Sequence, residues 1–210
     1  MPDRLYFTDS DEANELIATD PMALLIGFSL DQQVTVGQAF LGPLRLRERL
    51  GTLDAGAIAA AELEPLFREK PAIHRFPAKM AQRVHDLAMH VRDEYGGDAA
   101  RVWAGVSDAS ELRRNIAGLP GFGEMKIKAL GSVLAKQFGV PAARALVPEH
   151  PTLGDVDSAQ ALEDYQSAKR EHKKSLSADR PSDRKPTPSS RARRSPPAGS
   201  RASGSSRRRA

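Results

Sequence analysis

The 210-residue sequence contains no cysteine. This absence excludes disulfide bonds, thiolate-ligated iron–sulfur clusters and cysteine-type zinc sites, and it fits a reducing compartment. The longest apolar run, residues 22–30, is far too short to cross a bilayer, which takes about 20 apolar residues. The acidic N-terminus has no apolar stretch of the signal-peptide kind. We therefore expect a cytoplasmic protein with no membrane contact.

Aromatic residues are also scarce and scattered, at 5% of the chain. A platform that stacks the bases of single-stranded nucleic acid needs clustered aromatics, so this composition argues against one. His85 and His90 lie five residues apart and do not share a helix face, which argues against a metal pair. We expect neither a metal site nor a cofactor.

Charge is divided unevenly along the chain. The segment 166–210 holds fourteen Lys/Arg and three Asp/Glu, a charge of +11, whereas residues 1–165 hold 17 basic and 24 acidic residues, a charge of −7. An acidic body with a basic tail suggests a polyanionic partner, although the tail could serve only solubility. The tail is rich in Ser, Pro and Arg and almost free of large apolar residues, so we expect it to be disordered. The body, residues 1–165, is expected to be the folded domain.

The body is predicted to be all-α, because no convincing alternating strand pattern occurs in it. Ser10, Asp20 followed by Pro21, and Asp108 with Glu111 are typical of helix starts. The Gly42-Pro43 pair is expected to kink or split the helix that contains it. The predicted helices cover residues 11–18, 20–30, 34–50, 57–70 as one or two short helices, 76–97, 98–103, 108–117 and 123–138.

A tight turn at residues 118–123 joins the last two of these helices into a hairpin over about residues 108–138. Gly121 and Gly123 permit positive φ or close approach of another backbone, and Phe122 could pin the turn between the helices. The second helix begins with free N–H groups and the positive end of its dipole, which suit a DNA phosphate. Lys126 and Lys128 add positive charge. The alternative is an ordinary helical hairpin whose glycines serve only packing.

Three segments resemble the HhH-GPD superfamily of base-excision DNA glycosylases, which includes endonuclease III. They are 119-LPGFG-123 with the later 138-FGVP-141, the early segment 20-DPMALLIGFSLDQQVT-35, and more loosely Lys79 at the start of the long helix. The resemblance implies a two-lobed helical fold with a DNA-binding cleft between the lobes and, in this chain, no iron–sulfur cluster. It also implies that Gln33 fills the space left by an extruded base and that Lys79 contacts DNA.

The catalytic residues of that family match less well. The resemblance implies an aspartate a few residues after the Phe-Gly-x-Pro segment, but this position falls on Leu146. Asp155 and Asp157 are the candidates further on, and each could instead cap the helix that follows. The family's lyase lysine falls on Met125, and Lys128 is one turn further along the helix. A monofunctional glycosylase is therefore expected in preference to a glycosylase/lyase.

Three functions remain open from the sequence. The first is a monomeric, nucleoid-associated DNA glycosylase that excises a damaged or mispaired base from duplex DNA. The second is a non-catalytic relative that binds DNA or senses damage without the aspartate. The third is a helical protein-interaction module.

Overall fold

The computed structural model describes residues 2–178, and the tail beyond Ala178 lies outside the described residues. Those residues form helices and connecting loops without a strand, as the sequence predicts. No helix in this part of the chain combines the length and apolarity needed to cross a bilayer. The elements are α1 (Asp11–Thr19), α2 (Pro21–Leu30), α3 (Val36–Leu50), α4 (Ala55–Ala60), α5 (Leu63–Arg68), α6 (Pro77–Tyr95), η1 (Ala99–Val102), α7 (Ala109–Gly118), α8 (Glu124–Lys136), η2 (Pro141–Leu146), η3 (Leu153–Asp155) and α9 (Ala159–Ala178).

The predicted capping residues start their helices. The Asp20 carboxylate accepts a hydrogen bond of 2.8 Å from the N–H of Met22, in the first turn of α2. The Asp108 carboxylate accepts one of 2.9 Å from the N–H of Glu111, in the first turn of α7. The Glu111 carboxylate in turn accepts a bond of 2.7 Å from the N–H of Ser107. The bonds from Met22 and Glu111 satisfy donors that the helix starts leave free, and the bond from Ser107 ties the preceding residue to the first turn of α7.

Helix α3 is continuous through Gly42-Pro43, which rules out the split among the two predicted outcomes. A proline inside a helix costs about 3 kcal/mol, so packing must offset that cost. Gly42 and Pro43 are buried against α2, and a Cβ atom on Gly42 would lie 2.4 Å from Leu30 Cδ1. This close contact between the two helices holds α3 in one piece.

Helix α9 runs to Ala178, so the expected tail boundary at Gln166 falls inside a helix. Ala, Gln, Glu, Lys and Leu dominate its sequence, and all of them favour helix. Leu162 is buried against the body and Tyr165 is half-buried, which anchors the first turns. The boundary at Gln166 was predicted from the distribution of charge, which does not indicate helix propensity.

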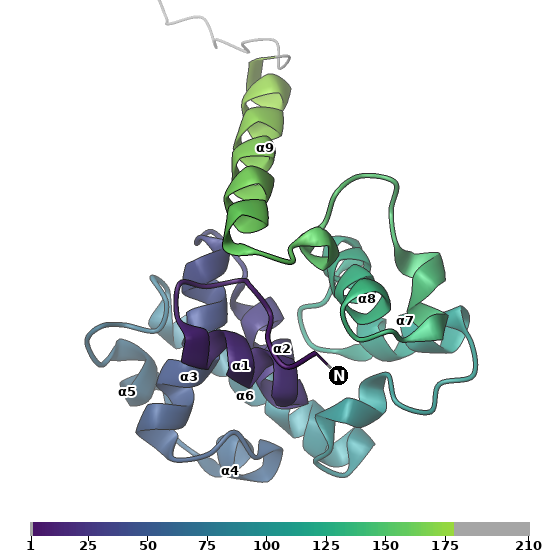
Figure 1. Cartoon of the computed structure of the whole chain (residues 1–210). Coiled ribbons are helices and arrows are strands. Elements are labelled where there is room, and N and C mark those ends of the chain that lie inside the picture. The colour runs from purple at the N-terminus through teal and green to yellow at the C-terminus, as the bar shows by residue number, and fades with distance from the viewer. Residues whose placement is uncertain (1, 179–210) are drawn as a thin grey trace, which may run out of the picture.

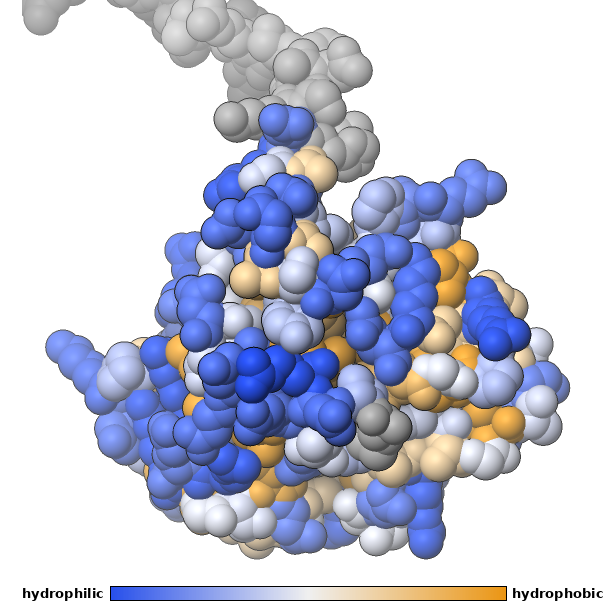
Figure 2. Space-filling view, in the orientation of Figure 1, coloured by the Kyte–Doolittle hydropathy of each residue, from blue (hydrophilic) through white to orange (hydrophobic). Residues whose placement is uncertain are grey.

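The helices gather in two groups, which Figure 1 shows side by side with α9 standing above them. The N-terminal group comprises α1 to α6, and the hairpin group comprises α7, α8, η2 and η3. One apolar core runs through both. In the N-terminal group Phe40 packs edge-on against Phe7 and Phe28, with ring centroids 4.9 and 5.1 Å apart. Figure 2 shows a mostly hydrophilic surface over α9 and the N-terminal group, with more apolar side chains over the hairpin group.

Glycines allow the closest helix contacts in both groups. A Cβ atom on Gly27 in α2 would lie 2.3 Å from the ring of Phe40 in α3. In the hairpin group, a Cβ atom on Gly131 in α8 would lie 2.7 Å from Leu146. Side chains larger than hydrogen cannot be accommodated there without a backbone shift, because protein interiors are close-packed.

We predict that Gly27→Ala destabilises the protein by about 1–3 kcal/mol, the usual cost of overpacking a core. Gly37→Ala is the matched control, because its new Cβ atom would lie an ordinary 3.7 Å from the Phe7 carbonyl oxygen. In a helix with room for it, the methyl group should stabilise by about 0.5–1 kcal/mol. Urea denaturation measures both. Equal stability of the two variants would contradict the packing described here.

Candidate nucleic-acid interface

The turn between α7 and α8 is tight and its centre is glycine. Gly121 has a φ of +80°, in the left-handed region that favours glycine. The N–H of Phe122 donates to the carbonyl of Leu119 at 3.1 Å and closes the turn. Both side chains are buried, Leu119 at 2% and Phe122 at 5% exposure, and they hold the turn against the body.

The start of α8 presents unused donors to solvent. Gly123 is the N-cap residue and provides no side-chain hydrogen bond. Within the described chain, the N–H groups of Gly123, Glu124 and Met125 donate to no protein acceptor. A Cβ atom on Gly123 would find open space within 4 Å. These donors, together with the positive end of the helix dipole, suit an anionic group.

A guanidinium group lies against this turn. A Cβ atom on Gly121 would be 3.2 Å from Arg83 Nε and 3.3 Å from Arg83 Cζ. The Nη1 atom of Arg83 is buried and, among the described residues, has no hydrogen-bond partner. Lys79 is exposed one turn earlier on α6, and residues four apart share a helix face. Arg83 forms no ion pair with a carboxylate in the described chain. Positive charge therefore lies behind the turn.

Lys126 links the hairpin to the N-terminal group. Its ammonium donates to the carbonyl oxygen of Ser29, near the end of α2, at 3.1 Å. It also lies 5.2 Å from the centre of the Phe122 ring, a cation–π distance. Burial, followed by the nearby charge of Arg83, lowers the pKa of Lys126 to about 8, while Asp31 opposes the shift. Lys126 therefore loses its charge at a lower pH than an ordinary lysine.

Gln33 lies on the loop that follows α2. It is exposed and has a φ of +57°, a conformation that costs about 1 kcal/mol or more for a residue other than glycine. The buried ring of His74 fixes this loop, because its Nε2 lies 3.1 Å from the carbonyl oxygen of Gln32. His74 Nδ1 accepts from the N–H of Phe76 at 3.1 Å, so Nε2 carries the proton and donates. Burial lowers the pKa of His74 and favours this neutral form.

A pocket of about 610 Å³ opens between α8 and α9. Met125, which is 76% exposed, and Lys128 both line it, as their spacing of nearly one turn predicts. Lys128 Nζ is also 4.0 Å from a Glu124 carboxylate oxygen. The full lining is Met125, Lys128, Ala129, His150, Pro151, Thr152, Tyr165, Ala168 and Lys169.

The positions considered for a catalytic carboxylate have different environments. Leu146 is a core residue with 9% exposure, packed on α8. The Asp155 carboxylate lies 2.5 Å from Lys136 Nζ and accepts 2.8 Å and 3.1 Å bonds from the N–H and hydroxyl of Thr152. Partial burial alone would raise the pKa of Asp155, but these bonds outweigh it and the pKa is lowered. Asp157 is exposed and, within the described chain, its carboxylate makes no hydrogen bond or ion pair.

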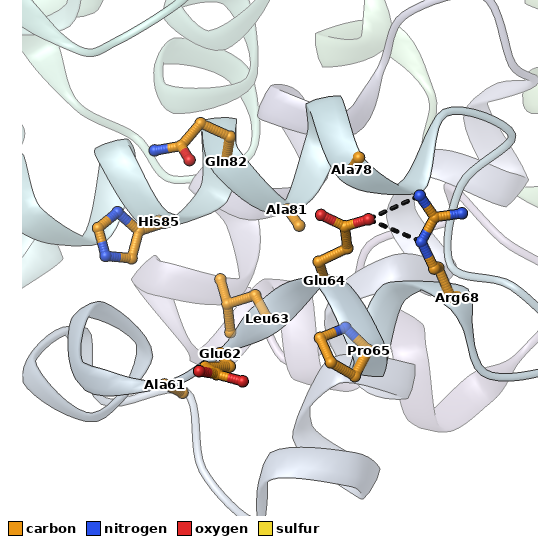
Figure 3. Close-up of a pocket in the computed structure, with 10 residues that line it drawn as sticks. All are labelled: Ala61, Glu62, Leu63, Glu64, Pro65, Arg68, Ala78, Ala81, Gln82 and His85. Carbon is orange, nitrogen blue, oxygen red and sulfur yellow. Dashed lines mark hydrogen bonds and ion pairs between the residues drawn. The ribbon is translucent and has the colours of Figure 1, made fainter.

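A second pocket, of about 620 Å³, lies away from the hairpin between α5 and α6 (Figure 3). Glu64 and Arg68 form an ion pair of 2.6 Å at its edge. His85 Nε2 lies 3.0 Å from the carbonyl oxygen of Ala59. No group of three or more potential metal ligands forms in the part of the chain that the structure describes.

One predicted hairpin residue is linked to the segment that leads to Gln33, because Lys126 bonds to Ser29, four residues before Gln33. Lys128 lines the pocket beside α9. Sequence reasoning missed Asp31 and Tyr165, which lie at this junction; the position of Asp31 directly after a capped helix was the one signal available. Comparison with protein-family models, with curated proteins and with solved structures found no match.

We predict that Lys126→Met stabilises the protein at pH 7, by up to about 3 kcal/mol. This upper bound comes from the lowering of the Lys126 pKa from 10.5 to about 8. Each pKa unit corresponds to about 1.36 kcal/mol of stability. Between about pH 8 and 10.5 the unfolded chain holds a proton on Lys126 that the folded chain has released. Stability of the native protein should therefore rise with pH in that window, and the advantage of the variant should shrink.

Urea denaturation at pH 7 and at pH 10 measures this difference. Lys128→Met is the control, because Lys128 is half-exposed and should change stability by less than about 0.5 kcal/mol. A stability loss in Lys126→Met at pH 7 would show that the bond to Ser29 outweighs the cost of burial.

Proposed function

We propose that this protein binds duplex DNA through the α7–α8 hairpin and acts as a monofunctional DNA glycosylase of the HhH-GPD kind. In this proposal the hairpin N–H groups hold a backbone phosphate. Gln33 enters the base stack where the target base leaves it, and the base enters the pocket between α8 and α9. Chemistry on a base requires such extrusion from the duplex.

One observation supports the proposal: the hairpin is bonded to the end of α2, and the Gln33 loop follows directly from that end. The bond runs from Lys126 to Ser29, residues separated by 97 positions in the sequence. A phosphate contact positions a protein on DNA without reading bases, so a second element must enter the duplex. Gln33 is exposed, and contacts from His74 and Arg75, in the segment before α6, fix the backbone of its loop.

The cations beneath the hairpin support an anionic partner. Arg83 is close enough to the half-buried Lys126 to lower the pKa of Lys126. A phosphate at the turn would lower this repulsion and gain hydrogen bonds to ionised donors, which are about twice as strong as neutral ones. Ordinary hairpin packing gives no reason to place two cations together.

A non-catalytic DNA-binding relative is the second candidate. It is favoured by the core position of Leu146, where a carboxylate would have to be buried, and by the ion pair and capping bonds of Asp155. Both candidates share the hairpin interface and differ only in base release.

We predict that Gly123→Asp weakens duplex binding by about 10-fold or more without destabilising the fold. The new carboxylate would occupy the free N–H groups at the start of α8 and repel phosphate. Its Cβ atom meets no other atom within 4 Å. Aspartate is also a better N-cap residue than glycine, by a few tenths of a kcal/mol. Fluorescence anisotropy with a 20-base-pair duplex and thermal denaturation measure the two effects.

Ser10→Asp is the matched control. It adds the same charge at the N-cap of α1, where Ser10 already accepts from the N–H of Ala13 at 3.2 Å. Its affinity for the duplex should change by less than about 2-fold, since a distant exposed charge is screened by salt. Equal losses in both variants would mean that net charge, and not the turn, governs binding.

We predict that removing residues 179–210, which include ten Lys/Arg, lowers the salt dependence of duplex binding. Log affinity falls as log salt rises. The magnitude of this negative slope should decrease by about 0.9 for every phosphate that the shortened protein no longer neutralises. Binding titrations at four salt concentrations measure that slope. An unchanged slope would show that the tail charges do not touch DNA.

A further inference from the structure

The carboxylates of the described chain are nearly all exposed or already engaged. Among residues whose side chains are described, only Asp20, Asp31 and Glu111 are partly buried rather than exposed. Asp20 caps α2, and Glu111 accepts from the N–H and hydroxyl of Ser107 at 2.7 Å. The Asp31 carboxylate accepts no hydrogen bond and forms no ion pair with any described residue.

Asp31 lies where the two helical groups meet. Its N–H donates to the carbonyl of Gly27 at 3.1 Å and ends α2, and Gln33 follows two residues later. Lys126 bonds to Ser29, two residues before Asp31. The backbone on either side of Asp31 is therefore tied down, while its side chain has no partner among the described residues.

The charge of Asp31 reaches side chains on two further elements. It raises the pKa of Lys126 on α8 against the stronger effects of burial and Arg83. On α9, burial first and the charge of Asp31 second raise the pKa of Tyr165. Tyr165 is also a wall of the pocket that Lys128 lines. Asp31 thus lies within electrostatic range of both the hairpin and the pocket.

Asp155 and Asp157 are less suited to stabilise a cation. Asp155 already neutralises Lys136 and completes a capping box with Thr152. Asp157 is exposed to water, which screens its field. A carboxylate that is partly removed from water acts more strongly on developing charge, provided that no other cation is already paired with it.

We infer that Asp31, rather than Asp155 or Asp157, is the catalytic carboxylate of this site. The inference rests on the proposed function. As the C1′–N bond breaks, its electron pair leaves with the base, which takes up one proton. The sugar becomes cationic and Asp31 stabilises it, as carboxylates do in glycoside hydrolysis. A water oxygen then bonds to C1′ and gives a proton to Asp31, which returns it to solvent.

A binding experiment tests this placement without requiring turnover. The full-length protein is titrated with duplexes that carry either a cationic pyrrolidine or a neutral tetrahydrofuran in place of one deoxynucleoside. Native protein should prefer the pyrrolidine duplex by about 10-fold or more, equivalent to about 1.4 kcal/mol. Asp31→Asn should bind both duplexes equally, with unchanged affinity for tetrahydrofuran. Asp155→Asn and Asp157→Asn should keep the preference.

A second experiment measures base release at single turnover from duplexes containing uracil, an oxidised pyrimidine, an oxidised purine or a methylated purine. Asp31→Asn should lose about 100-fold or more in rate, the range found when one electrostatic contact to a transition state is removed. Its duplex affinity should match that of the native protein, and its melting temperature should be equal or slightly lower, because the charge of Asp31 offsets part of the cost of burying Lys126. Asp31→Ser provides a second variant if the amide perturbs the loop.

The outcomes separate this inference from the proposed function. If Asp31→Asn keeps the cation preference and Asp157→Asn loses it, Asp31 is wrong and the glycosylase proposal stands. If native protein shows no preference and releases no base, yet Gly123→Asp still weakens binding, the glycosylase proposal and Asp31 both fail and the DNA-binding relative remains. If Gly123→Asp has no effect either, the hairpin interface itself is wrong.

Discussion

The contact on which the site depends is a lysine ammonium held against a backbone carbonyl. Lys126 donates to Ser29 at 3.1 Å, and this bond joins the first turn of α8 to the last turn of α2. A half-buried lysine costs stability, as its pKa of about 8 shows. The last carbonyls of a helix have no partner within it and form the negative end of its dipole, so they favour a cation. The hairpin is therefore held against the end of α2 by a hydrogen bond as well as by apolar packing, although burying the lysine costs stability.

The turn itself is shaped by what lies beneath it. Arg83 packs so closely under Gly121 that a methyl group there would meet its guanidinium at 3.2 to 3.3 Å, and the φ of +80° already disfavours any side chain. Gly123, in contrast, is extended and has open space around it. Backbone conformation and packing therefore favour glycine at position 121, but neither excludes a side chain at position 123. Gly121 is required by the fold, whereas a side chain at Gly123 would meet open space, which makes Gly123 the position that separates binding from stability.

Local signals in the sequence predicted most of the helices because their ends are determined by neighbouring residues. Asp20 and Asp108 cap the helices that they were expected to cap, and the hairpin lies where its glycines indicate. The continuity of α3 through Pro43 could not be predicted, because it depends on Leu30 packing against Gly42. Asp31 was missed for the same reason: a carboxylate at a helix end gives no local sign that a lysine 95 positions later will lie beside it.

The charge of the chain gains meaning from this arrangement. Residues 1–165 carry −7, which alone would repel DNA. Many of the arginines outside the site are paired, as Arg4 is with Asp11 and Arg113 with Glu124, and such pairs present little net field. Arg83 makes no ion pair within the described chain, and Lys126 is held by a carbonyl instead of a carboxylate. An acidic body can therefore attract an anion at one place, because ion pairs cancel many charges elsewhere, whereas Arg83 and Lys126 form no ion pair in the described chain.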